Sequence, residues 1–536
     1  MTDRATIVLA LAVVAGAWWA HEVPPTLVLA GVAAAVGLRR PVILVVAALL
    51  LSALLGSRAW AGLEPPPVPV AVEGEVTLLS DPVDVDGALR VDVRVGSRRV
   101  EAWARGAPAG ALRARLAGER VTLAGRLRAP PEHARPWLAR RHVASRLSVA
   151  RVDGWRHGHA PSRAANAVRR TLVEGAAPLD RDRRALFTGF VLGDVREQAV
   201  EVADDFRGSG LTHLLAVSGS NVAFVLTLAS PLLRRLGLRS RWAATLGLIA
   251  FFALMTRFEP SVLRASAMAA IACTAGGLGR PASRRRILAL AVTAVVLVDP
   301  IIVRALAFQL SVGASAGIIT LSGPIARRLP GPRLLANVLA VTIAAQVGVA
   351  PILVPVFGGL PLSSIPANLL AVPAAGPLMA WGLTGGIVAG LAGPPVDWLL
   401  HLPTAALTGW VAAVARWGSG LPLGQIRSVH LIGLAAVGVA TVVTWRSPSL
   451  RPVLAAVATA VLFAPAVLPP GGELRAVPIA HGAELWRAGG VVLVVDDADP
   501  GRLLDRLRLA GIDRVDVLVV RRGTRPTAST VLILRR

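Results

Sequence analysis

The chain has 536 residues, of which 54% are hydrophobic and only 17% are charged, and its mean hydropathy is +0.62. Soluble chains carry about 25% charged residues, so this composition excludes an ordinary soluble protein and indicates a bilayer environment. The 57 basic residues are all Arg and face 32 acidic residues, which gives a net charge of +25. This excess fits codon bias with cytoplasmic anchoring charges, and it also fits a polyanionic partner, because clustered Arg binds phosphate bidentately.

The absence of Lys excludes two kinds of chemistry. A P-loop uses Lys to reach nucleotide phosphates, and Schiff-base enzymes use Lys as their nucleophile. The single Cys273 excludes an internal disulfide and a thiolate-clustered metal site, and we expect it to pack in its apolar segment. No cofactor is expected.

Three apolar segments open the chain and predict N-terminal transmembrane helices within residues 1–57, at 5–20, 25–38 and 41–57. Trp18 and Trp19 stand where a signal-peptide cleavage site needs small residues, so we interpret the first segment as a span. Arg4 precedes the first segment, and Arg39 and Arg40 separate the second from the third. The positive-inside rule therefore predicts a cytoplasmic N-terminus and an extracytoplasmic region after the third span.

Residues 64–160 are predicted to form an extracytoplasmic β domain. Four segments alternate apolar and polar residues as strands do: Val68–Leu79, Leu89–Val95, Arg99–Ala104 and Arg120–Leu127. Short strands with Gly between them favour a small OB-like barrel. Such barrels bind single strands through basic grooves and aromatic stacking, but Trp103 is nearly the only aromatic residue in these strands. A structural barrel and a nucleic-acid-binding barrel both stay open.

The remaining chain divides into three parts. Residues 161–208 are amphipathic and predict connecting helices on the outer surface or between spans. Residues 209–468 are predicted to form a second membrane block. It contains Arg clusters at 234–241, 280–286, 327–333 and 446–451. The positive-inside rule places all four in the cytoplasm if the chain has about 13 spans and an extracytoplasmic tail. Residues 474–536 read as a small α/β unit. The predicted fold is therefore mainly α, a polytopic helical membrane protein with an OB-like domain and an α/β remnant.

Polar residues concentrate at membrane depth in Ser209-Gly210-Leu211-Thr212-His213-Leu214-Leu215-Ala216-Val217-Ser218-Gly219-Ser220-Asn221-Val222. Polar groups in a bilayer are costly unless they face a cavity or one another. Gly219 weakens a helix at this point. We therefore expect a broken helix, which suits irregular backbone that lines a water-filled path.

Gly210 to Val222 resembles the signature of the ComEC family of competence proteins, approximately G-L-x-H-L-L-A-[VI]-S-G-x-x-V. Members often have Leu-His where this chain has Ser220-Asn221. Other segments match family motifs in the same order: Gly193-Asp194 upstream, then Pro260-Ser261-Val262-Leu263-Arg264-Ala265, Asp299-Pro300, Phe308-Gln309-Leu310-Ser311-Val312-Gly313-Ala314, and Ile365-Pro366-Ala367-Asn368-Leu369-Leu370 with Pro373.

The resemblance implies an inner-membrane channel for the uptake of single-stranded transforming DNA in natural competence. It also implies contacts with membrane lipid, with a DNA receptor and with a cytoplasmic motor, and it leaves a homo-oligomer open. We expect one DNA path lined by His213, Ser218, Ser220, Asn221, Arg264, Gln309, Ser311 and Asn368, with Gly210, Gly219, Pro260 and Pro366 shaping the backbone. Hydroxyls, amides and few cations bind phosphates weakly enough to release them.

Each of these residues also has a purely structural interpretation. His213 fits a hydrogen-bonded core residue, and Arg264 fits an interfacial residue whose charge reaches the membrane surface. Gln309 and Asn368 fit polar contacts between helices, and Pro366 fits an ordinary kink.

Two other functions would use the same residues. A membrane-embedded enzyme would take Ser218 as nucleophile and His213 as base, but the two are five positions apart and no carboxylate lies close in sequence. A transporter for a small solute would use the same cavity.

Many members of the resembled family end in a metallo-β-lactamase-like domain, and residues 474–536 resemble only its beginning. Val491–Asp496 predicts a strand, Leu503–Leu509 a helix, and the segment ending at Val520 a second strand. Arg521–Pro526 then stands where the family's T-H-x-x-x-D-H cluster should follow, and His481 is the only His in the tail. We therefore expect no metal, no nuclease activity and no enzyme. His157-Gly158-His159 likewise has no ligand cluster nearby.

Overall fold

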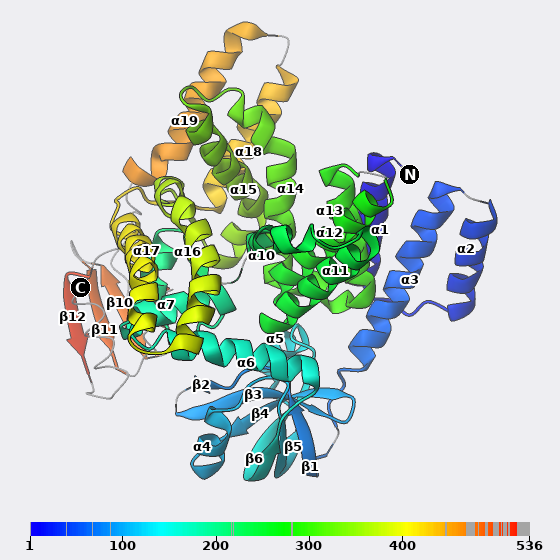
Figure 1. Ribbon diagram of the computed structural model, residues 1–536. Coiled ribbons are helices and arrows are strands. Elements are labelled where there is room, and N and C mark those ends of the chain that lie inside the picture. Colours follow the sequence, from blue (N-terminus) through cyan, green and yellow to red (C-terminus); the bar gives the residue numbers. More distant parts are fainter. Residues whose placement is uncertain are drawn as a thin grey trace.

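The protein is mainly helical, with a β domain below the helices (Figure 1). The computed structural model describes residues 2–38, 40–66, 68–85, 87–215, 217, 219–279, 282–444, 447–467, 477–480, 482–487, 491–496, 503–504, 506–507, 512 and 515–521. Six helices within this part of the chain are long and apolar enough to cross a membrane, and shorter apolar helices accompany them. The protein is therefore a multi-pass membrane protein, whereas the total of about 13 spans stays a prediction.

The three predicted N-terminal segments are helices: α1 (Asp3–Trp19), α2 (Pro25–Leu38) and α3 (Pro41–Ala61). α1 and α3 run parallel and pack closely through small residues. A Cβ added at Gly16 would lie 2.2 Å from the Leu49 carbonyl oxygen, and one added at Gly56 would lie 3.1 Å from Ala20 Cβ. Both helices therefore end on the same side of the bundle.

The β domain contains the four predicted strands and two that the sequence did not reveal. Its elements are β1 (Val70–Leu78), β2 (Val83–Val85), β3 (Ala88–Val95), β4 (Arg98–Ala104), α4 (Ala107–Arg113), β5 (Arg120–Arg128), a 3₁₀ turn (Glu132–Ala134), α5 (Arg135–Ala139) and β6 (Val143–Arg156). The sheet order is β1-β5-β6-β4-β3-β2, and β1 also pairs with β3 through Thr77 and Arg94. This extra pairing joins β1, β5, β6, β4 and β3 in a ring around a core that includes Leu78, Val93 and Leu123.

The connecting region forms α6 (Ala160–Gly175), α7 (Arg181–Leu192) and α8 (Val200–Gly208). α7 is buried from Ala185 to Leu192 and packs into the membrane block, where Phe187 and Val191 join the largest apolar cluster. The sequence left two positions open for these helices, on the outer surface or between spans. α7 lies between other helices, so the outer-surface position is wrong for α7.

The second membrane block begins with α9 (Thr212–Leu215), α10 (Gly219–Leu233), α11 (Leu238–Met255), α12 (Pro260–Gly277), α13 (Arg284–Val298) and the 3₁₀ helix η2 (Pro300–Arg304). It continues through α14 (Leu306–Ala326), α15 (Arg333–Phe357), β7 (Leu360–Pro361), α16 (Ser364–Ala392), α17 (Val396–Ser419), β8 (Gln425–Ile426), α18 (Ser428–Val443), a 3₁₀ turn (Pro448–Leu450) and α19 (Arg451–Val467). β7 pairs with β8, so the turn that precedes α16 is tied to the turn that follows α17.

Contacts define two opposite ends of the N-terminal helices. On the β-domain side, His142 Nε2 and Asp299 Oδ1 lie 2.7 Å apart, and Arg257 Nη2 donates to Asp81 Oδ1 at 2.8 Å. The turns that follow α11 and α13 therefore face the β domain. At the other end, Ser283 Oγ donates to Asp3 Oδ2 at 2.6 Å, so the chain's N-terminus and the start of α13 lie together.

The tail contains β9 (Val477–Ala480), β10 (Ala483–Arg487), β11 (Val491–Val495) and β12 (Val517–Val520), in the sheet order β12-β11-β10-β9. The two predicted strands are confirmed as β11 and β12, which pair in parallel. The predicted helix is helical at 503–504 and 506–507. The other residues of this predicted helix lie outside the described residues. His481 and the segment 522–526 lie outside them as well.

Candidate functional site

The motif segment follows a sharp change of chain direction after α8. Gly210 has φ +69°, a conformation that favours glycine, and a Cβ added there would lie 2.4 Å from Ser364 Cβ. α9 then makes about one turn, and α10 begins at Gly219. The expected break is present, but Gly219 starts a helix rather than interrupting one. Ser218 lies outside the described residues.

Arg264 on α12 connects this segment to α14. Its Nε donates to Ser311 Oγ at 2.7 Å, its Nη1 lies 2.9 Å from Met268 Sδ, and a Cβ added at Gly219 would lie 2.7 Å from its Nη2. The residue is only 8% exposed. Arg264 is therefore enclosed by α10, α12 and α14, and the interfacial interpretation of this residue is wrong.

The Arg264 guanidinium has no anionic partner in the part of the chain that the structure describes. Among the residues that the structure describes, no carboxylate oxygen lies within 4.0 Å of it, and its two polar contacts are a hydroxyl and a thioether. A buried cation without a counter-ion is costly and attracts any anion that can approach it. An intramembrane charge of this kind is a functional feature by default.

A second polar group surrounds Ser364 at the start of α16. Asn368 Nδ2 donates to the Ser364 carbonyl oxygen at 2.7 Å, and Gln346 Nε2 on α15 donates to Ser364 Oγ at 3.1 Å. Gly210 packs against the same serine. Ser364 was not among the candidates, although a serine four residues before Asn368 on an apolar helix was a usable signal.

The two candidate prolines start helices. Pro260 is the first residue of α12, and Pro366 lies in the first turn of α16. The first amides of a helix have no intrahelical acceptor, so proline removes no hydrogen bond there. Pro366 is therefore not the kink that the alternative interpretation expected.

The other described candidates have different surroundings. Asn221 Nδ2 donates to the Phe190 carbonyl oxygen on α7 at 3.1 Å, and Gln309 Nε2 donates to the Val303 carbonyl oxygen at 2.8 Å. His213 is exposed on α9, and Ser220 is exposed on α10. The contacts thus unite Gly219, Arg264 and Ser311, and separately Gly210 and Asn368. One path through all eight candidate lining residues stays a prediction.

Sequence reasoning missed a buried ion network that joins the β domain to the helices. Asp81 accepts hydrogen bonds from Arg169 Nη2 at 2.9 Å and from Arg257 Nη2 at 2.8 Å. Arg169 also donates to Asp194 Oδ2 at 3.3 Å, and Arg196 pairs with the same carboxylate. These five residues, called the joint cluster below, come from four separate segments, so no local spacing reveals them.

The joint cluster holds its carboxylates in the charged form. Burial by itself would raise the pKa of Asp81, but Arg257 and Arg169 outweigh it and hold that pKa below the ordinary value of 3.8. Burial also opposes ionisation of Asp194, and the hydrogen bond and charge of Arg196 again lower its pKa. The cluster contains three Arg and two Asp, so it is an ionised joint at neutral pH.

The H-x-H residues have other contacts. His157 packs edge-on against Trp155 with ring centres 4.8 Å apart, and a ring nitrogen of His159 lies 3.0 Å from Arg120 Nη2. Within the described part of the chain, no group of three or more His, Cys, Asp or Glu side chains could hold a metal ion.

Comparison with known proteins identifies the membrane block. The model of the Competence protein family matches residues 190–451, which extend from the end of α7 to the start of α19. No curated protein and no solved structure matches the chain. The matched region contains every candidate site residue, including Gly219, Arg264 and Ser311, and through residues 190–451 the chain belongs to the Competence protein family.

Proposed function

We propose that this protein is a channel of the bacterial inner membrane that takes up single-stranded DNA during natural transformation, and that it is not an enzyme. The observation that carries the proposal is the Arg264 guanidinium, which is buried without a carboxylate partner in the described structure and packed on Gly219 of the family motif. Membership of the Competence protein family supports a role in DNA uptake.

A buried cation without a carboxylate partner in the described residues suits transport of a polyanion. Phosphate charges cannot cross the hydrocarbon core, about 30 Å thick, without a polar path. Arg264 would attract each phosphate in turn, while Ser311 and the polar groups near Ser364 would exchange hydrogen bonds with water and phosphate. Binding by one cation and several neutral groups is weak enough for release, which conduction requires.

The proposal includes an orientation and a set of partners. The N-terminus would be cytoplasmic, with the β domain and the tail outside, because Arg285 and Arg286 lie near Asp3 at the end of α1 far from the β domain. The ring of strand pairings supports an OB-like barrel for the β domain. A DNA receptor would act on this outer side and a motor on the cytoplasmic side, and a homo-oligomer would place several copies in one complex.

The test is entry of fluorescent single-stranded DNA into liposomes that contain the purified full chain, scored by protection from external nuclease. Arg264→Gln should lower the entry rate by about tenfold or more, because one charge-assisted contact is lost. Arg264→Lys should retain part of the rate. Arg241→Gln, at an exposed position near the start of α11, is the matched control and should leave it unchanged.

Three results would contradict the proposal. Equal entry with Arg264→Gln would remove Arg264 from the path. Passage of small anions without DNA would favour the solute transporter. Cleavage or acylation of a substrate without transport would favour the membrane enzyme.

A further inference from the structure

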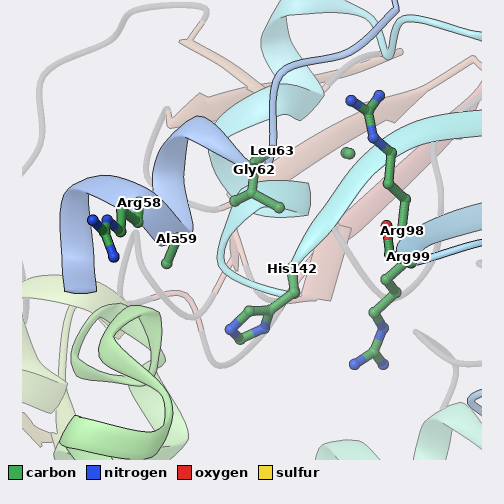
Figure 2. Close-up of a pocket in the computed structure, with 9 residues that line it drawn as sticks. Arg58, Ala59, Gly62, Leu63, Arg98, Arg99 and His142 are labelled. Carbon is green, nitrogen blue, oxygen red and sulfur yellow. The ribbon is translucent and has the colours of Figure 1, made fainter.

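A pocket of about 450 Å³ lies where α3 meets the β domain. It is lined by Arg58, Ala59, Gly62, Leu63, Ser97, Arg98, Arg99, His142 and Ala144. Figure 2 shows Arg58 on the α3 side, Arg98 and Arg99 on the β4 side, and His142 between them. Three Arg and one His line the pocket and no acidic side chain does, so the lining is cationic.

Two of the three guanidinium groups are available to a ligand. The Arg58 side chain is exposed and has no ion pair or hydrogen bond among the described residues. Arg98 is exposed with one long contact, 3.4 Å, to the Glu64 carbonyl oxygen. Arg99 is held by Asp92 at 2.9 Å, and His142 by Asp299 at 2.7 Å. The pocket thus combines two side chains held by carboxylates, Arg99 and His142, with two accessible guanidinium groups. A guanidinium group can donate two parallel hydrogen bonds to phosphate oxygens.

Exposed tryptophans place this pocket at the level of the membrane surface. Trp18 and Trp19 are about half exposed at the end of α1, and Trp60 lies at the parallel end of α3, two residues from Arg58. Arg304 donates to the Trp18 carbonyl oxygen and lies 4.7 Å from the Trp18 ring and 5.4 Å from the Trp60 ring. Tryptophans gather where hydrocarbon meets the headgroups.

We infer that this pocket binds the phosphodiester headgroup of an anionic phospholipid, such as phosphatidylglycerol. The ligand is a lipid rather than a nucleic acid because Arg58 of the pocket lies two residues from Trp60, at the end of α3 beside the exposed Trp18. At that level a headgroup can enter while its acyl chains stay in the bilayer. Arg58 and Arg98 bind the phosphate, while Ser97 faces the polar end of the headgroup. Such a lipid would hold the β domain against the membrane, and this inference does not depend on DNA transport.

The test uses the purified full chain in nanodiscs of equal phosphatidylcholine and phosphatidylglycerol, released into a native mass spectrometer to count retained lipids. The wild-type chain should retain phosphatidylglycerol in preference to phosphatidylcholine. The double variant Arg58→Gln/Arg98→Gln should lower that preference by about tenfold or more. Arg126→Gln, at an exposed position on β5 outside the pocket lining, is the control and should keep it.

Two outcomes would overturn the inference. One is a wild-type chain that retains the two lipids equally, or a double variant that keeps the wild-type preference for phosphatidylglycerol at an unchanged melting temperature. The other comes from a second arm with a labelled oligonucleotide and nanodiscs of phosphatidylcholine alone. If the double variant loses oligonucleotide binding but keeps its phosphatidylglycerol, the pocket serves a nucleic acid and not a lipid.

Discussion

At the scale of single residues, two glycines of the family motif lie in close contact with side chains of other helices. A Cβ added at Gly210 would lie 2.4 Å from Ser364 Cβ, and one added at Gly219 would lie 2.7 Å from Arg264 Nη2, the far end of a flexible side chain. The glycines of the motif therefore position its polar neighbours, and we assign the electrostatic role to Arg264.

Gly210→Ala should destabilise the protein by about 1–3 kcal/mol beyond the cost of its backbone conformation, because the new methyl group would overlap Ser364. Gly279→Ala is the matched control, since Gly279 also has a positive φ, +65°, but no atom lies within 4 Å of an added Cβ. Thermal unfolding of both variants in detergent measures the difference. Equal melting temperatures would show that the contact with Ser364 is not tight.

The buried carboxylate of the joint cluster makes a second prediction at this scale. Asp81→Asn removes the carboxylate that pairs with Arg257 and leaves Arg169 with Asp194 alone, which should cost about 3–5 kcal/mol. Hydrogen exchange should rise at Ala117, whose amide donates to Asp81. The control Asp84→Asn breaks only the exposed pair with Arg113 and should cost less than about 1 kcal/mol.

The pH dependence of the joint follows from the lowered pKa values of Asp81 and Asp194. A carboxylate whose folded pKa lies below its unfolded value stabilises the fold fully above the unfolded value, and loses this contribution as the pH falls through the folded one. Ala117 protection should therefore be constant from about pH 8 to pH 5 and should decline only below about pH 4. A decline centred near pH 6 would contradict the assignment to carboxylates.

At the scale of elements, α14 and α15 pack through glycines. A Cβ added at Gly317 would lie 2.2 Å from the Ala344 carbonyl oxygen, and one added at Gly348 would lie 2.2 Å from that of Gly313. Small residues allow membrane helices to approach closely where no hydrophobic force joins them. α14 also contacts α12, where Ser311 Oγ accepts a hydrogen bond from Arg264 Nε.

Gly317→Leu should force α14 and α15 apart and abolish both folding yield and DNA entry, since the contact is with backbone that cannot move aside. Gly323→Leu on the same helix meets only the flexible end of Arg327, at 3.6 Å, and should leave the yield of folded protein unchanged. Size-exclusion profiles of the two variants compare them. Similar monodisperse peaks would refute the close packing.

The elements show which parts of the fold the sequence can reveal. Strands β1, β3, β4 and β5 were predictable because apolar and polar residues alternate along them in the sequence. β6 was missed because it begins with three successive buried residues, Val143–Ser145, and its pairing with β5 shifts register twice. The sequence could not predict that α7 is buried, because an amphipathic pattern identifies an apolar face but not the surface that covers it.

The candidate site was also only partly predictable from the sequence. The motif order identified Arg264 and Ser311 as polar residues worth attention, but their contact spans 47 positions and depends on how three helices pack. The joint cluster connects positions 176 apart, Asp81 and Arg257, and each alone reads as an ordinary surface charge. Local patterns predict elements, whereas buried charge networks are a property of the tertiary fold.

At the scale of the whole molecule, the charge layout fits the proposed passage of a polyanion. The β domain is joined to the helices by buried ion pairs, and a cationic pocket lies where α3 meets the β domain. Arg264, which has no carboxylate partner among the described residues, lies within the family domain. We infer that these features act in series, with the β domain held in place beside the entrance of the membrane path.

The central claim is that this protein conducts single-stranded DNA, and entry of DNA into liposomes tests it most directly. Liposomes with the wild-type chain should protect a labelled single strand from external nuclease. The same sequence as a duplex should stay digestible, because a duplex carries twice the phosphate charge per unit length of a single strand. Protein-free liposomes set the baseline. Protection of the single strand no greater than this baseline, in liposomes with correctly inserted protein, would contradict the account.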